Sequence, residues 1–97
     1  MHLYFNRAIL RIGNEDIRLT RMQAHIMRAI IIGGDRPSSI MDIAEQIWPV
    51  TLGPDEVTKT LHVQICRIRQ RMGRWAPWIV TRFQFGYVTK IHATWSE

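Results

Sequence analysis

The chain has 97 residues, of which 46% are hydrophobic, and its formal net charge is +5 at pH 7. This length fits one compact domain, is too short for two, and leaves little volume for a buried catalytic cleft. The N-terminus lacks the pattern of a secretory signal, and no apolar stretch approaches the ~20 residues of a membrane span. The single cysteine excludes an internal disulfide framework, so we expect a cytoplasmic protein in a reducing compartment.

The positive charge is concentrated in the C-terminal part of the chain. Residues 1–56 carry six arginines against seven acidic residues, a net charge of −1. Residues 57–97 carry seven basic residues against Glu97 alone, a net charge of +6. This asymmetry favours a face that binds a polyanion. A basic surface that serves only solubility is the alternative on charge alone.

The first predicted elements are strands. Weak alternation of apolar residues around the turn Gly13-Asn14 predicts short antiparallel strands over about residues 3–19. Thr20 followed by Gln23 matches a capping box, in which each residue satisfies a free N–H group of the other. We therefore expect the first helix over about residues 20–32.

Two more helices and a hairpin follow. Ser39 with Asp42 starts a helix over about residues 39–48, and a polar loop separates it from a helix over about 57–72. Five residues form the apolar stripe of this third helix: Val57, Leu61, Ile65, Ile68 and Met72. Residues 79–91 predict a β-hairpin. The fold class is α+β, with one domain over residues 1–97.

The third helix carries basic and polar side chains opposite its apolar stripe. At about 100° per residue, Lys59, Val63, Cys66 and Gln70 point directly outward. Arg67 and Arg74 lean to one side with Gln64 and Arg71 further round, and His62 and Arg69 lie on the other side. No acidic residue occurs between Val57 and Glu97. Such a face suits DNA phosphates and the acceptor edge of guanine, although an exposed basic helix without a partner is the alternative.

Four short motifs together resemble a known family. The run KTLHVQICRIRQRMG over residues 59–73 is similar to the recognition helix of OmpR/PhoB-type winged helix-turn-helix domains. The first helix from Leu19-Thr20, the second from Ser39 to Trp48, and the wing with Thr81-Arg82 and Gly86-Tyr87 resemble the corresponding segments of that family, in the same order. The resemblance covers about residues 8–91.

The resemblance implies a bacterial or phage transcription regulator that binds double-stranded DNA in the cytoplasm, at the nucleoid. It implies that the third helix enters the major groove and the hairpin, or wing, lies near the minor groove. Arg67 takes the position of a base-contacting arginine, Gln64 that of a histidine, and Arg82 that of the wing arginine. The predicted DNA-binding residues are Lys59, His62, Val63, Gln64, Cys66, Arg67, Arg69, Gln70, Arg71, Arg74, Arg82 and Lys90.

The resemblance also implies protein partners. The loop between the second and third helices, with Gly53, Asp55 and Glu56, corresponds to a segment that contacts RNA polymerase. A second copy of the chain on an adjacent half-site, head to tail, is a further expected partner. Two alternatives to sequence-specific regulation stay open: a module that docks on RNA polymerase or another DNA-bound machine, and an architectural protein that binds DNA without sequence preference.

Other chemistry is not expected. The sequence contains no catalytic triad pattern, phosphate-binding glycine loop or paired carboxylates, so we predict neither an enzyme nor a bound cofactor. The four histidines lack metal-ligand spacing, which argues against a metal site. Cys66 between basic residues is either a redox-sensitive thiol or a small side chain tolerated at a groove-facing position. The four tryptophans either wedge helix ends against the core or stack on bases.

Overall fold

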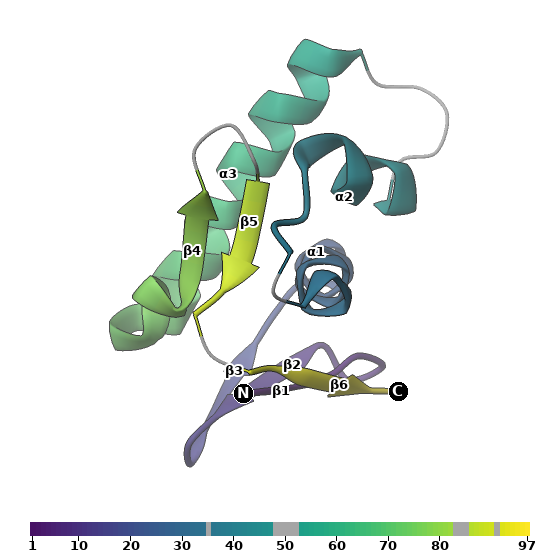
Figure 1. Ribbon diagram of the computed structural model, residues 1–97. Helices are drawn as coiled ribbons and strands as arrows, with labels where there is room; N and C mark the ends of the chain where they lie inside the picture. The colour runs from purple at the N-terminus through teal and green to yellow at the C-terminus, as the bar shows by residue number, and fades with distance from the viewer. Residues whose placement is uncertain (35, 48–52, 83–85, 91) are drawn as a thin grey trace.

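The molecule is built in layers, with a sheet at one end and the helices and hairpin stacked on it (Figure 1). The computed structural model describes residues 1–34, 36–47, 53–82, 86–90 and 92–97. In chain order the elements are β1 (His2–Tyr4), β2 (Ile9–Ile12), β3 (Glu15–Arg18), α1 (Arg21–Gly33), α2 (Ile40–Ile47), α3 (Pro54–Met72), the 3₁₀ helix η1 (Gly73–Trp78), β4 (Ile79–Arg82), β5 (Gly86–Thr89) and β6 (Thr94–Ser96). This order of strands, three helices and a hairpin confirms the predicted α+β class.

The first sheet joins the two ends of the described chain. Its strand order is β3-β2-β1-β6, in which β1 pairs antiparallel with β2 and parallel with β6. The predicted hairpin is confirmed, and Gly13 occupies its turn with φ +59°. β6 is not predicted by the sequence pattern; its three residues pair with β1 so that His2 lies opposite Thr94. The His2 ring also contacts the hydroxyls of Thr94 and Ser96, at 2.6 and 2.8 Å.

The helix ends follow local rules. The capping box of α1 is present: the Thr20 N–H donates to Gln23 Oε1 at 2.9 Å, and Thr20 Oγ1 accepts from the Gln23 N–H at 3.2 Å. The Ser39 hydroxyl likewise accepts from the Asp42 N–H at the start of α2. α3 begins at Pro54, three residues before the predicted start. A proline fits the first turn because no N–H is needed there, and the two acidic residues that follow favour the positive helix end.

The core lies between the sheet and α3, with α1 in the middle (Figure 1). The predicted apolar stripe of α3 is confirmed, since its five residues are each at most 3% exposed. Trp75, Trp78 and Trp95 are partly buried against this core, whereas Trp48 lies outside the described residues. Within the described part of the chain, no helix is long and apolar enough to cross a membrane.

The hairpin is attached to the connection between α1 and α2. Ser38 and Tyr87 exchange two backbone hydrogen bonds, of 2.8 and 3.0 Å. Gly86, with φ +116°, lies so close to this connection that a Cβ added to it would be 1.9 Å from the Ser38 carbonyl oxygen. The position of the hairpin is therefore fixed by the helical core as well as by its own strand pairing.

His25 on α1 makes stability depend on pH. Burial, together with the nearby Arg28 and Arg21 charges, lowers the pKa of His25 below its ordinary value, and its ring packs edge to face on Phe5. Because the unfolded chain then binds this proton more readily, we expect the free energy of unfolding to be highest above about pH 6.5 and to fall as the pH drops below it. Thermal denaturation of wild type and His25→Gln between about pH 5 and 7 measures the effect. The variant should lose less stability over this range, and an equal loss would contradict the assignment.

Candidate nucleic-acid interface

The predicted DNA-binding residues all reach the surface. α3 buries its apolar stripe against the core, which turns the opposite side of the helix to solvent. Of the twelve residues, ten are exposed and two, Gln64 and Arg69, are partly buried. They come from α3, from the start of η1 at Arg74 and from the hairpin, where Arg82 ends β4 and Lys90 follows β5.

Five side chains of this surface make no polar contact with the rest of the described protein. Lys59, Val63, Cys66, Arg67 and Gln70, which we call the outward face of α3, have no hydrogen-bond or ion-pair partner among the described residues. Val63 is an apolar side chain that is 47% exposed. Donors and one apolar group are therefore presented together, with no acidic side chain among them.

Arg69 and His62 form the side of α3 that faces the hairpin. Arg69 Nη2 donates to the Ile79 carbonyl at 2.8 Å and to Thr81 Oγ1 at 2.9 Å, both on β4. His62 Nδ1 lies 3.3 Å from the hydroxyl of Tyr87 on β5, and burial raises the pKa of that tyrosine. These two side chains connect α3 to the hairpin, a role that the sequence pattern does not predict.

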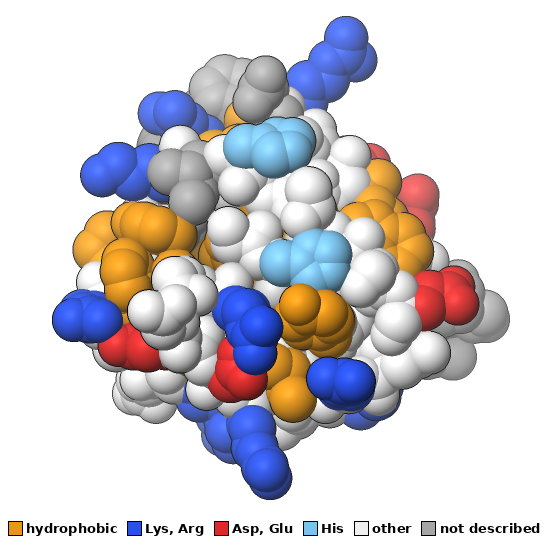
Figure 2. Space-filling view, turned by 90° about the horizontal axis from the view of Figure 1, so that it is seen from below, with side chains coloured by type: hydrophobic (Ala, Val, Ile, Leu, Met, Phe, Trp, Pro, Cys, Tyr) orange, Lys and Arg blue, Asp and Glu red, His pale blue; other side chains and the backbone are white. Residues whose placement is uncertain are grey.

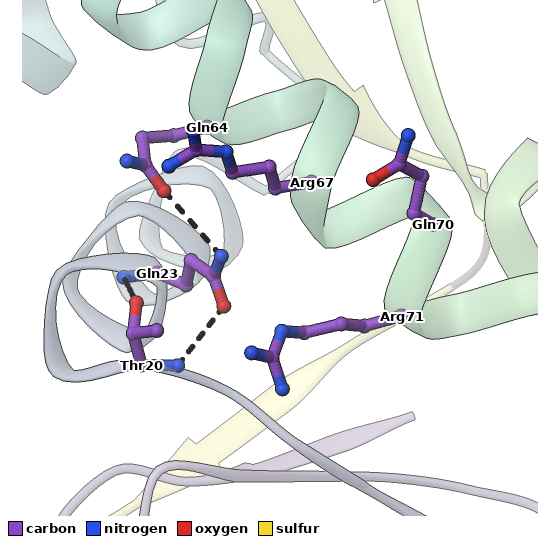
Figure 3. A pocket seen from close by; sticks show the side chains of 6 residues that line it. All are labelled: Thr20, Gln23, Gln64, Arg67, Gln70 and Arg71. Atoms are coloured by element: carbon purple, nitrogen blue, oxygen red, sulfur yellow. Dashed lines mark hydrogen bonds between the residues drawn. The ribbon is translucent and has the colours of Figure 1, made fainter.

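Gln64 and Arg71 form the other side, which faces α1 and β3. Gln64 Oε1 accepts from Gln23 Nε2 at 3.4 Å, and Arg71 Nη1 donates to the Arg18 carbonyl at 3.0 Å. A hollow of about 560 Å³ opens here, as Figure 3 shows. Its lining residues are Thr20, Gln23, Gln64, Arg67, Gln70 and Arg71. Gln64 and Arg71 therefore lie on one side of α3, and His62 and Arg69 lie on the other, as the helical periodicity of the sequence predicts.

Two basic side chains outside the outward face of α3 form ion pairs with acidic residues of β3. Arg74 forms an ion pair with Glu15 of β3, which also accepts from Trp75 Nε1 at 2.9 Å. Arg11 bonds Asp16 at 2.7 Å and holds the pKa of that carboxyl below its usual value. Figure 2, which looks at the molecule from below, shows basic and acidic side chains next to one another. Mixed charge on this side contrasts with the acid-free outward face of α3.

The remaining predictions are located as follows. Gly53, Asp55 and Glu56 are exposed at the N-terminal end of α3, while residues 48–52 of the preceding loop lie outside the described residues. The turn of the hairpin, residues 83–85, also lies outside them. Cys66 is a free, exposed thiol. No group of three or more His, Cys, Asp or Glu side chains in the described ranges is placed to hold a metal ion.

Comparison with known proteins adds no identification. No model of a protein family matches the chain, and no curated protein matches it either.

Arg69 is expected to stabilise the fold through the hairpin. Replacing it with methionine keeps the aliphatic stem but leaves the Ile79 carbonyl and Thr81 without their donor, at a cost of about 1–2 kcal/mol in the free energy of unfolding. Urea denaturation measures the change. Gln70→Met, at the neighbouring exposed position, is the control and should change stability by less than about 0.5 kcal/mol. Equal effects of the two variants would show that the Arg69 contacts add nothing.

Proposed function

We propose that the chain binds double-stranded DNA in a sequence-selective manner and acts as a transcription regulator. The observation that carries this proposal is the outward face of α3. It combines free basic and amide side chains with an apolar one and contains no acid, on a helix of 19 residues. At about 1.5 Å per residue such a helix is about 28 Å long, and a helix of this kind fits the major groove of B-DNA.

The side chains of the outward face divide into two kinds of contact. Arg67 offers a planar pair of donors that matches O6 and N7 of guanine. Lys59 offers a single mobile ammonium group, which suits a phosphate oxygen and carries no sequence information. The exposed Val63 suits contact with a thymine methyl group. Selectivity is therefore assigned mainly to Arg67 and general affinity mainly to Lys59.

The hairpin supplies the second proposed contact. Arg82 is exposed at the end of β4, and the hydrogen bonds of Arg69 hold this strand against α3. With α3 in the major groove, an arginine here is suited to an adjacent narrow minor groove, where the negative potential is strongest. The resemblance to OmpR/PhoB-type domains supports the same arrangement. It also extends the proposal to RNA polymerase, through Asp55 and Glu56, and to a second copy on an adjacent half-site.

Salt dependence tests the electrostatic part of this proposal. If α3 and the hairpin make about five phosphate contacts, the logarithm of the binding constant should fall with the logarithm of salt concentration at a slope of about −4 to −5. Lys59→Ala should weaken binding to all sequences alike and make the slope less steep by about one. Mobility-shift assays on mixed DNA fragments at several salt concentrations measure both quantities.

The control for this experiment removes the same charge elsewhere. Arg7 lies beside the Tyr4 ring near the N-terminal sheet, far along the chain from α3. Arg7→Ala should leave the slope unchanged. A binding constant that does not depend on salt, or an equal change of slope in the two variants, would contradict the proposal.

A further inference from the structure

A chain of hydrogen bonds leads from the capping box of α1 to the proposed DNA surface. It runs from the Thr20 backbone N–H to Gln23 and from Gln23 to Gln64 on α3 (Figure 3). Gln23 is only 2% exposed, so its amide group has little access to other partners. Gln64 is partly exposed and borders the same hollow as Arg67.

The hydrogen bond between Thr20 and Gln23 determines which atom donates and which accepts in the hydrogen bond between Gln23 and Gln64. A backbone N–H can only donate, so the Thr20 N–H requires the oxygen of Gln23, and Oε1 accepts it at 2.9 Å. The nitrogen of Gln23 is then left facing α3, where it can only donate. Gln64 must therefore turn its oxygen toward Gln23, and this contact is 3.4 Å long. Reversing either amide group would bring two donors face to face.

The consequence is that Gln64 presents a nitrogen outward. In Figure 3 the amide nitrogen of Gln64 lies on the side away from Gln23. This nitrogen has no hydrogen-bond partner among the described residues, and no buried side-chain polar atom in them lacks a partner, so the nitrogen is open to solvent. Gln64 and Arg67 are three residues apart on α3 and therefore neighbours on its surface.

We infer that Gln64 reads a base as a hydrogen-bond donor only, and that the buried Gln23 sets this preference. The inference rests on the proposed DNA binding and deepens it. A glutamine that is free to use both atoms pairs with N6 and N7 of adenine. With its oxygen held by Gln23, Gln64 instead selects a base whose major-groove edge carries hydrogen-bond acceptors and no donor, which is guanine or thymine. This base lies at the base pair next to the one read by Arg67.

Gln23→Glu reverses the donor and acceptor roles in the hydrogen bond between residues 23 and 64, with little change in side-chain shape. Glutamate also completes a capping box, so the Thr20 N–H keeps its acceptor and the helix start is preserved. The carboxylate no longer donates, and Gln64 must turn its nitrogen inward and its oxygen outward. The preferred base at that position should change to adenine or cytosine, which offer an amino group, with a change in relative enrichment of about three- to tenfold.

Selection from randomised duplexes with four variants tests this inference. Gln64→Ala should lose the preference at the one position, and Gln23→Glu/Gln64→Ala should give the same motif as Gln64→Ala, because Gln23 acts only through Gln64. Gln64→Glu leaves the capping box intact and should also favour adenine or cytosine. Unchanged base preference in Gln23→Glu, or uniform weakening on all sequences, overturns the inference while leaving the DNA-binding proposal in place. If wild type itself enriches no motif, the proposed function fails and base reading by Gln64 fails with it.

The polarity of the two amides can also be measured without DNA. In NMR spectra of the free protein, the side-chain NH₂ protons of Gln64 should exchange with water as fast as those of Gln70, which is exposed on the same helix. In Gln23→Glu the Gln64 protons should exchange more slowly, because one of them is then bonded to the carboxylate. Slower exchange of Gln64 than of Gln70 in wild type would overturn the assigned direction.

Discussion

Replacing Arg67 with alanine is expected to weaken binding to the preferred DNA sequence by about 1–3 kcal/mol and to affect random DNA far less. Arg67 lies at the edge of the outward face of α3, beside the hollow that opens toward α1, and its guanidinium has no partner in the described part of the chain. It is therefore available to donate to O6 and N7 of one guanine together. Losing both bonds removes the preference at one base pair, whereas the electrostatic attraction to the phosphates falls by a single charge.

Two further variants separate base reading from charge. Arg67→Lys keeps the charge but not the planar pair of donors, so it should retain most of the general affinity and lose most of the selectivity. Arg74→Ala is the matched control, because Arg74 is already paired with Glu15. It should leave the selected motif unchanged. Selection from randomised half-sites, followed by affinity measurement on the enriched duplex, gives all three results. An identical motif for wild type and Arg67→Ala would show that Arg67 contacts only phosphate and reads no base.

Replacing Gly86 with alanine is expected to destabilise the protein by about 2–4 kcal/mol. Gly86 has φ +116°, a region that side chains with a Cβ rarely adopt. The added methyl group would also lie 1.9 Å from the Ser38 carbonyl oxygen, a backbone atom that cannot turn aside. Relief of this clash requires β5 to move away from the α1–α2 connection, which breaks the two backbone hydrogen bonds between Ser38 and Tyr87.

Gly34→Ala is the control for backbone conformation alone. Gly34 has φ +61°, and nothing lies within 4 Å of a Cβ added to it. It should therefore cost only about 1 kcal/mol, from the strained conformation. Urea denaturation of both variants measures the difference. If Gly86→Ala were no more destabilising than Gly34→Ala, the close contact between the hairpin and Ser38 would not be a feature of the folded protein.

Local patterns were sufficient to predict most of the elements. The Thr20–Gln23 capping box depends on two residues three positions apart, and the structure contains both of its hydrogen bonds. The periodicity of α3 gave the correct buried stripe. It also placed Arg69 and Gln64 on opposite sides of the helix, where they contact β4 and α1 respectively. Spacing along one helix is enough for such predictions because the helix imposes the geometry.

Long-range contacts could not be predicted in the same way. β6 has three residues and no distinctive pattern. It is a strand because it pairs with β1, which lies at the other end of the sequence. The Gln23–Gln64 and Arg74–Glu15 contacts join residues 41 and 59 positions apart. Nothing in either local segment specifies these pairs. They arise once the core has brought α1, α3 and β3 together, and they decide which polar side chains of α3 stay free.

The central claim is that the outward face of α3 lies in the major groove of a preferred DNA sequence. Methylation interference on a duplex selected by the wild-type protein tests it most directly, because dimethyl sulfate modifies guanine at N7 in the major groove and adenine at N3 in the minor groove. We predict that selection enriches a motif containing guanine and that N7 methylation of this guanine prevents binding in wild type, whereas Arg67→Ala becomes insensitive to it. Enrichment of no motif, or binding that tolerates N7 methylation at every guanine, would contradict the claim.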